Sequence, residues 1–134
     1  MKYSKTIMLQ SCHFNYGETY EAHKNNIMKE TISTKEYMRV LEDIHGHDFK
    51  IVVDITKEEY STGLNYMVDD VVINDIVQEW NNKNLSVHED FVSHGCRATT
   101  ENMALLLKCK LERKINNCKI KVTVHETRDM YASV

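Results

Sequence analysis

Proline is absent from this chain of 134 residues, and glycine occurs only four times. Flexible linkers are rich in small and turn-forming residues, so this composition argues against domains joined by long linkers. The sequence also contains no internal repeat and no low-complexity tract. We therefore expect one compact domain over residues 1–134, a length that suits a single hydrophobic core.

An excess of positive charge is also missing, since the formal net charge is −3 at pH 7. Nucleic-acid binding through bulk charge would require a basic excess, so we expect no nucleic-acid partner. No apolar run approaches the ~20 residues that span a bilayer, and the opening MKYSKTIMLQSCHF lacks the apolar segment of a secretory signal. We expect a cytoplasmic protein with no membrane partner.

Cysteines are few and do not form a C-x-x-C pair. The four of them are Cys12, Cys96, Cys109 and Cys118. Their density is too low for a disulfide scaffold, and no export signal accompanies them. We interpret them as reduced thiols of a cytosolic protein.

The segment IHGHDFKIVVDI, residues 44–55, shows the alternation of a β-strand. Every second side chain of a strand lies on the same face, and here that row consists of His45, His47, Phe49, Ile51, Val53 and Ile55. Four of these six side chains are apolar, which marks the row as the buried one. Two imidazoles therefore lead a row of side chains that faces the core.

Strands are also expected near the two ends of the chain. Near the start, Ile7 and Leu9 form an apolar row that ends at His13. Near the end, Glu126 continues the inward parity of a half-buried strand whose apolar residues are Ile120, Val122 and Val124. A histidine and a carboxylate thus end two further buried rows.

Two long helices and one short helix are predicted by apolar spacing. In residues 66–84, positions i, i+3, i+4 and i+7 are apolar, namely Ile73, Ile76, Val77 and Trp80. A second helix begins with Thr99 or Thr100 as its N-cap, and its apolar stripe is Met103, Leu106, Leu107 and Leu111. A short helix fits within residues 33–44, and residues 85–100 are interpreted as a polar loop.

The predicted order is strand, short helix, strand, long helix, long helix, strand. A fourth strand has room before the first long helix. Because each strand has one apolar and one polar face, we expect an α+β fold in which an antiparallel sheet carries its helices on one face.

The inward histidines suggest a metal site. His45 and His47 are two residues apart on one strand, so they share a face at a separation of ~6.5 Å along the strand. His13 from a neighbouring strand would complete three nitrogen ligands and leave a fourth position open, as in catalytic zinc sites. The inward positions of the three histidines are also compatible with core histidines that only make hydrogen bonds. Likewise, Glu126 could end its strand in contact with solvent. Both interpretations remain open on the residues alone.

Four blocks of the sequence, LQSCH, HGHDF, ATTEN and VTVHETRDMYA, resemble the signature blocks of a known family. The family is that of 6-pyruvoyl-tetrahydropterin and 6-carboxy-tetrahydropterin synthases, whose blocks read roughly F-x-A-A-H, H-G-H-N-Y, P-T-x-E-N and a strand-ending E-T. The resemblance implies Zn²⁺ bound by His13, His45 and His47. It also implies a T-fold, a four-stranded antiparallel sheet with two helices on one face. It further implies subunits that form trimer rings, which pair into homohexamers with active sites at subunit interfaces.

The same resemblance implies a lyase that acts on 7,8-dihydroneopterin triphosphate. The branch we favour makes 6-carboxy-tetrahydropterin for queuosine and related deazapurines, and the 6-pyruvoyl product is the nearest alternative. Glu126 is similar to the glutamate that anchors the pterin, since two carboxylate oxygens can accept hydrogen bonds from a ring N–H and an exocyclic amine. Thr99 and Thr100 are similar to the threonines that contact the pterin, while Glu101 suits the positive end of a helix.

Two positions depart from the family pattern. The family cysteine stands four residues before the first histidine of H-G-H, where this chain has Leu41. The family loop L-D-H-x-x-L-N corresponds to LSVHEDF, which keeps His88 but has Val87 in place of the aspartate.

Three explanations of these departures stay open. Glu42, adjacent to the lost cysteine, is the first candidate for a replacement base, because zinc already acidifies the substrate. Alternatively Cys12 or Cys96 reaches the site, although Cys12 has the opposite parity to His13. In the third, the protein binds pterin and zinc but catalyses another reaction or none. The expected catalytic residues are His88, Glu126 and Glu42.

Overall fold

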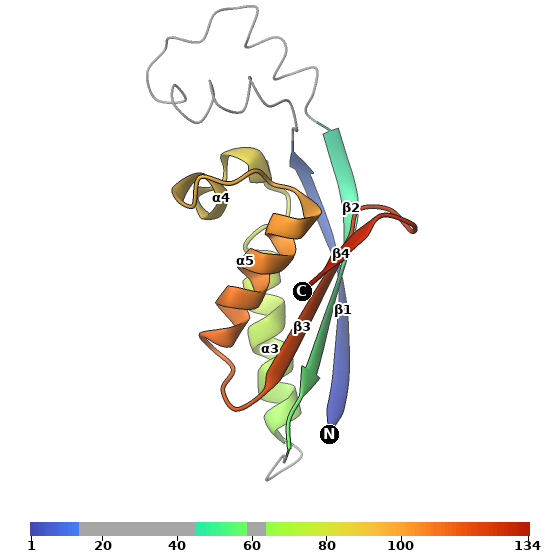
Figure 1. Ribbon diagram of the computed structural model, residues 1–134, viewed down its shortest axis with the longest axis vertical. Helices are drawn as coiled ribbons and strands as arrows, with labels where there is room; N and C mark the ends of the chain where they lie inside the picture. Colours follow the sequence, from blue (N-terminus) through green and yellow to red (C-terminus); the bar gives the residue numbers. More distant parts are fainter. Residues whose placement is uncertain (14–44, 59–63) are drawn as a thin grey trace, which may run out of the picture.

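The computed structural model describes residues 1–13, 45–58 and 64–134 (Figure 1). Its sheet contains β1 (Lys2–His13), β2 (His45–Thr56), β3 (Lys119–His125) and β4 (Tyr131–Ser133). The strands lie in the order β1-β2-β3-β4, and each neighbouring pair is antiparallel. The predicted antiparallel four-stranded sheet is thereby confirmed.

The position of the fourth strand differs from the prediction. It was expected before the first long helix, but it follows β3 as the short hairpin strand β4. Its pairing includes Val124 opposite Ala132, and Val122 exchanges two backbone hydrogen bonds with Val134. A strand of three residues is too short to show an alternation in the sequence, which explains why it was missed.

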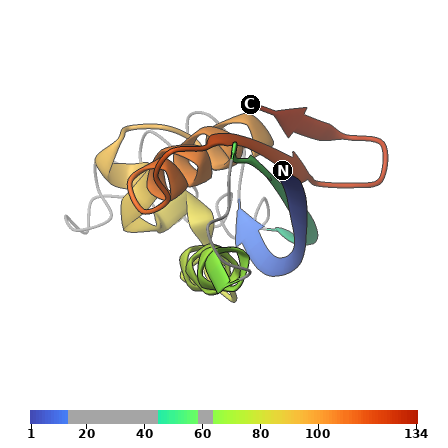
Figure 2. The same ribbon diagram turned by 90° about the horizontal axis from the view of Figure 1, so that it is seen from below.

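The helices are α3 (Leu64–Gln78), η1 (Leu85–Val87), α4 (Glu89–Ser93) and α5 (Thr100–Glu112). The two long helices α3 and α5 cover the same face of the sheet, as predicted (Figure 2). No helix in the described parts of the chain is both long and apolar enough to cross a membrane.

The segment predicted as a polar loop contains two short helical turns, η1 and α4. The side chain of Asn84 accepts a hydrogen bond from the N–H of Ser86, and His88 does the same for the N–H of Asp90. These local caps satisfy the first backbone donors of each turn, so short helices form without an apolar stripe. The predicted short helix within residues 33–44 lies outside the described residues.

The core lies between the sheet and the two long helices. The strands contribute their inward-facing apolar side chains, namely Ile7, Leu9, Phe49, Ile51, Val53, Ile55, Ile120, Val122 and Val124. The helices contribute Ile73, Ile76, Val77, Met103, Leu107 and Leu111. The predicted helical stripe included Trp80, but α3 ends at Gln78 and Trp80 lies in the turn that follows, where its side chain is fully buried. Burying one such side chain contributes ~1.5–3 kcal/mol, so these rows fix which face of each strand is inward.

The register of the sheet brings the polar ends of the inward rows together. His13 lies directly opposite His45 in the β1–β2 pair, and Ser11 lies opposite His47. The turn after α3 ties down the same end of β1, because the Ser11 hydroxyl lies 2.6 Å from the Lys83 carbonyl oxygen and the Cys12 N–H donates to it at 3.0 Å. The site described next lies at this fixed end of the sheet.

Candidate metal centre

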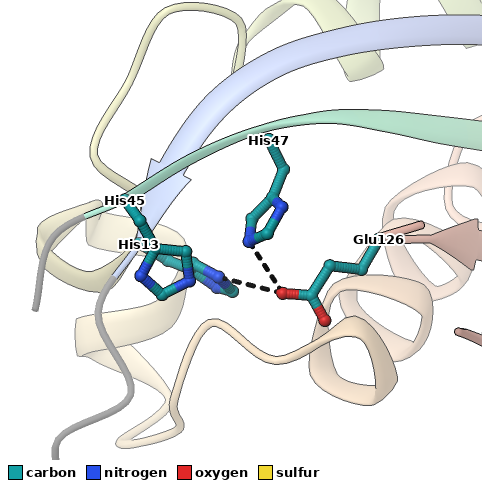
Figure 3. A group of neighbouring side chains, drawn as sticks. All are labelled: His13, His45, His47 and Glu126. Carbon is teal, nitrogen blue, oxygen red and sulfur yellow. Dashed lines mark ion pairs between the residues drawn. The ribbon is translucent and has the colours of Figure 1, made fainter.

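Three histidines and one glutamate gather at one end of the sheet. His13 ends β1, His45 and His47 begin β2, and Glu126 directly follows β3. One possible ligand atom from each residue lies within 4.8 Å of those of the others. Figure 3 shows the side chains pointing toward a common centre from three different strands.

The strand register explains why these four side chains meet. The pairing of His13 with His45 places two imidazoles side by side, and the two-residue spacing adds His47 on the same face. On the other side of β2, Lys50 pairs with His125. Continuing that antiparallel register by one residue places Glu126 beside Phe49, which has the same inward parity as His47.

The three imidazole rings contact one another edge-on. Their centroids are 4.6 Å apart for His13 and His45, 4.8 Å for His45 and His47, and 5.0 Å for His13 and His47. The fully buried ring of Phe49 lies 5.6 Å from His13 and 5.2 Å from His47. The aromatic side chain thus forms an apolar floor that limits how far the imidazoles can turn.

His13 is held by a backbone carbonyl. Its Nδ1 atom lies 2.6 Å from the carbonyl oxygen of Ala98, and its side chain is almost completely buried. A carbonyl can only accept, so Nδ1 donates, and in the neutral ring Nε2 carries the lone pair. This is the arrangement by which proteins orient histidine ligands toward a metal. No pattern in the sequence predicted this role of Ala98, which lies in the loop before α5.

Glu126 approaches two of the imidazoles closely. Its Oε1 atom lies 2.8 Å from Nε2 of His47 and 3.4 Å from Nε2 of His13 (Figure 3). Both Nε2 atoms are buried, yet neither makes a hydrogen bond of acceptable direction within the described residues. The short distances therefore reflect nitrogen atoms that point toward a shared centre beside the carboxylate oxygen.

The electrostatic surroundings favour a neutral His47. Burial lowers the pKa of its imidazole, and the neighbouring His13 and His45 lower it further, while the carboxylate of Glu126 opposes them. The net shift of the pKa is downward. Only a neutral imidazole can donate its lone pair to a metal, so this environment keeps the ligand form available.

A family model described as 6-pyruvoyl tetrahydropterin synthase matches residues 8–134. The chain belongs to this family. The resemblance inferred from the four sequence blocks is thereby confirmed, and membership identifies the chain as a tetrahydropterin-synthase-type lyase.

Solved structures of the same family share the fold. The Caenorhabditis elegans 6-pyruvoyl tetrahydropterin synthase has a TM-score of 0.70 and 16% identity, covering 100% of this chain and 94% of that chain. A Plasmodium vivax 6-pyruvoyltetrahydropterin synthase has a TM-score of 0.54 and 13% identity, covering 100% and 97%. At these identities the likeness is one of fold, and it agrees with the expected T-fold. No protein of curated function matches the chain in sequence.

The threonines expected from the family pattern lie at the start of α5. Of the two threonines predicted as N-cap candidates, Thr99 is the N-cap, and its hydroxyl accepts a hydrogen bond from the N–H of Asn102 at 3.3 Å. The Thr100 hydroxyl donates to Glu101 at 3.4 Å. Hydrogen bonds from its own backbone N–H and from Thr99 lower the pKa of Glu101, which suits a carboxylate at the positive end of a helix. Both threonines follow directly on Ala98, which orients His13.

His88 lies outside the four-residue group. Its Nδ1 accepts the N–H of Asp90 at 3.1 Å and so caps α4. The carboxylate of Asp90 is 3.6 Å from the same nitrogen, so His88 has an acidic neighbour although Val87 stands at the family's aspartate position. Asp90 does not follow from the family pattern, because it stands two residues after His88, whereas the family aspartate stands directly before the histidine.

The cysteine alternatives gain no support within one subunit. None of the four cysteines forms a disulfide, and none belongs to the four-residue group. The Cys12 thiol is directed to the Lys83 carbonyl oxygen at 3.6 Å, and Cys96 packs against the core. Burial raises the pKa of both thiols, which disfavours the reactive thiolate. Glu42 and Leu41 lie outside the described residues.

Proposed function

We propose that the chain is a zinc-dependent lyase that converts 7,8-dihydroneopterin triphosphate into 6-carboxy-tetrahydropterin, in the branch that leads to queuosine and related deazapurines. The observation that supports it best is the meeting of His13, His45 and His47 with a carboxylate at the end of the sheet. Family membership supports the pterin substrate. The proposal includes a cytoplasmic location and a single domain over residues 1–134.

The donor set of the site fits zinc. Three imidazoles and an adjacent carboxylate are ligand types that Zn²⁺ prefers, and His13 and His47 present buried Nε2 atoms without hydrogen bonds. His13 also has the carbonyl partner typical of a zinc ligand. When bound, zinc supplies a Lewis acid that acidifies protons beside the side-chain hydroxyls of the substrate.

The remaining residues have roles in binding the pterin. The carboxylate of Glu126 accepts hydrogen bonds from the pterin ring N–H and the exocyclic amine, a bidentate contact that excludes rings without this donor pair. Thr99 and Thr100 contact the pterin from the start of α5. In this arrangement the pterin ring lies between the strand ends and the helix.

Glu42 takes the place of the family cysteine as the base that moves protons on the substrate. A supporting observation is that a Plasmodium vivax 6-pyruvoyltetrahydropterin synthase has been solved with a catalytic glutamate replaced by alanine and also by cysteine. His88 supplies the second acid–base group. Because it lies outside the metal group of its own subunit, we assign it to the site of a neighbouring subunit in the ring.

The proposal includes assembly into homohexamers made of two trimer rings. Within the described residues the 12-residue strand β1 lies at the edge of the sheet, where Gln10 and Cys12 bond to the turn after α3 and the preceding residues have no strand partner on that side. An edge of this kind invites pairing with another chain. Sedimentation equilibrium tests this directly. A monomer at micromolar concentration would contradict the ring, and with it the assignment of His88 to a neighbouring site.

Two alternatives remain as candidate functions. The similar solved structures are named 6-pyruvoyl synthases, which favours a product that keeps all three side-chain carbons. Leu41 and Val87 favour a divergent member that binds pterin and zinc with altered or lost catalysis.

One experiment separates these functions. Purified protein is assayed for bound zinc and then incubated with 7,8-dihydroneopterin triphosphate, with products followed by mass. A 6-carboxy product, with loss of a two-carbon fragment, supports our proposal, whereas a 6-pyruvoyl product supports the first alternative. Zinc with unchanged substrate supports the divergent member. Protein that neither contains nor takes up zinc overturns the proposal.

A further inference from the structure

We propose that Glu126 has a second role, as a removable fourth ligand of the metal. In the substrate-free protein its carboxylate completes the shell formed by His13, His45 and His47, and it leaves that shell when it binds the pterin. Recognition of the pterin ring therefore opens the metal position that the substrate side chain needs. This inference rests on the proposed function, because it requires a metal at the three histidines.

The distances fit a carboxylate ligand. Zinc binds imidazole nitrogen and carboxylate oxygen at roughly 2.0–2.2 Å, so two ligand atoms of a tetrahedral site lie about 3.3–3.5 Å apart. The Oε1 atom of Glu126 is 3.4 Å from Nε2 of His13 and 2.8 Å from Nε2 of His47. The distance to His13 is that expected between two ligand atoms of one zinc ion. The shorter distance to His47 would lengthen to the same value after a small rotation of the Glu126 side chain.

The direction of the His13 lone pair points to the same conclusion. Nδ1 of His13 donates its proton to the Ala98 carbonyl oxygen at 2.6 Å, which leaves a lone pair on Nε2 of the neutral ring. This nitrogen is buried and makes no directed hydrogen bond, although a carboxylate oxygen lies beside it. A lone pair and a carboxylate oxygen repel each other unless a cation lies between them. A metal ion shared by both groups is the arrangement that satisfies both.

Glu126 can leave the metal without a change of the backbone. The backbone N–H of Glu126 donates to the Met130 carbonyl oxygen at 2.9 Å. The backbone N–H of Met130 donates to the Thr127 hydroxyl at 3.2 Å. This hydrogen-bonded turn between β3 and β4 fixes the main chain. The Glu126 side chain is 25% exposed, so rotation about its own torsions can carry the carboxylate toward solvent or a bound ring.

The two roles of Glu126 exclude each other. A carboxylate that accepts two hydrogen bonds from a pterin uses both oxygens, and neither remains for the metal. By linkage, binding of a pterin ring must therefore lower the affinity of the protein for the metal, and the metal must lower the affinity for the pterin ring by the same factor. The free protein is protected from water activation at the metal, because its fourth position is filled until a pterin arrives.

Cobalt(II) provides the test, since its visible absorption is intense in four-coordinate sites and weak in sites of higher coordination. Protein stripped with a chelator is titrated with Co²⁺ as wild type, as Glu126→Gln and as Asp48→Asn. Asp48 is exposed and follows His47 on the opposite face of β2, so this matched control removes a nearby negative charge without removing a ligand atom. Loss of a residue that only supports a ligand costs about 10- to 100-fold in metal affinity, so loss of Glu126 should cost at least tenfold.

We expect Glu126→Gln to weaken Co²⁺ binding by at least tenfold and to change the visible spectrum, while Asp48→Asn changes neither. Addition of unsubstituted pterin should change the wild-type Co²⁺ spectrum in the same direction as the substitution does. This change is measured on wild-type protein, so it is informative even if Glu126→Gln fails to fold. Equal spectra and affinities for wild type and Glu126→Gln, with no response to pterin, would overturn this inference alone. Failure of the wild type to bind Co²⁺ or Zn²⁺ would overturn the proposed function as well.

Discussion

The Nδ1 atom of His13 lies 2.6 Å from the carbonyl oxygen of Ala98, a contact between residues 85 positions apart that joins the end of β1 to the loop before α5. The contact fixes the proton on Nδ1 and directs Nε2 toward His47 and Glu126. It also joins the four-residue group to the start of α5, where Thr99 and Thr100 lie. Under the proposed function, the metal ligands and the threonines that contact the pterin would therefore be held by the same hydrogen-bonded support.

Substitution of His13 should remove the metal. We expect His13→Gln to lower zinc from about one ion per chain to a small fraction, because an amide is a poor substitute for an imidazole donor and the carbonyl contact is lost. Bound zinc in the purified protein is measured by atomic absorption. His94→Gln is the matched control, since His94 is exposed at the end of α4 and lies outside the group. Equal zinc in both variants would contradict the ligand assignment.

Stability of the metal-free protein should fall as the pH is lowered through the histidine range. The folded-state pKa of His47 lies below its ordinary value, mainly because burial disfavours the charged ring, so the unfolded chain binds the proton more readily. The contribution of His47 is therefore present above about pH 6.5 and is lost as the pH falls toward the lowered pKa. Urea unfolding at several pH values measures it. His47→Gln should show a shallower loss, and an identical slope would contradict this assignment.

The alternation of β2 and the parity of His13 and Glu126 could be predicted from the sequence, because the side-chain period of a strand is local. Family resemblance then indicated that the four side chains belong together. The orienting role of Ala98 could not be predicted, since it depends on a contact between distant segments. For the same reason the close approach of the Glu126 carboxylate to Nε2 of His13 and of His47 could not be predicted from the sequence.

Two errors of the sequence analysis have local causes. β4 has only three residues and forms through backbone bonds to β3, so its composition carries no periodic signal. The turns η1 and α4 depend on capping side chains rather than on apolar spacing, so the segment looked like a polar loop. Both kinds of element are stabilised by hydrogen bonds of the backbone, which leave no periodic pattern of hydrophobic residues in the sequence.

Asp90 should contribute measurably to stability through two hydrogen bonds. Its Oδ2 atom accepts from Trp80 Nε1 at 2.7 Å and from Lys110 Nζ at 2.6 Å. Burial by itself would raise the pKa of Asp90, but these two donors outweigh it and the net shift is downward. We expect Asp90→Ala to lower the free energy of unfolding by about 1–3 kcal/mol at neutral pH, because the buried indole N–H loses its acceptor.

The Asp90 measurement is made by urea unfolding, with Asp75→Ala as control because Asp75 is exposed on α3. The folded-state pKa of Asp90 is lowered, so its contribution is present above the ordinary aspartate range and disappears as the pH falls below it. The difference between wild type and Asp90→Ala should therefore shrink in acid. A difference that stays constant down to about pH 2 would contradict the ionic part of this explanation.

Catalysis should depend on Glu42 and not on a thiol. Loss of a general base typically lowers the rate by about 100- to 10,000-fold, so we expect Glu42→Gln to reduce kcat within that range and to leave zinc content unchanged. Cys12→Ser and Cys96→Ser should keep full activity, because Cys12 is directed to Lys83 and Cys96 lies against the core. Steady-state turnover of 7,8-dihydroneopterin triphosphate measures all three variants. Loss of activity in a serine variant, with Glu42→Gln unaffected, would move the base to that thiol and require it to reach the metal group of another subunit.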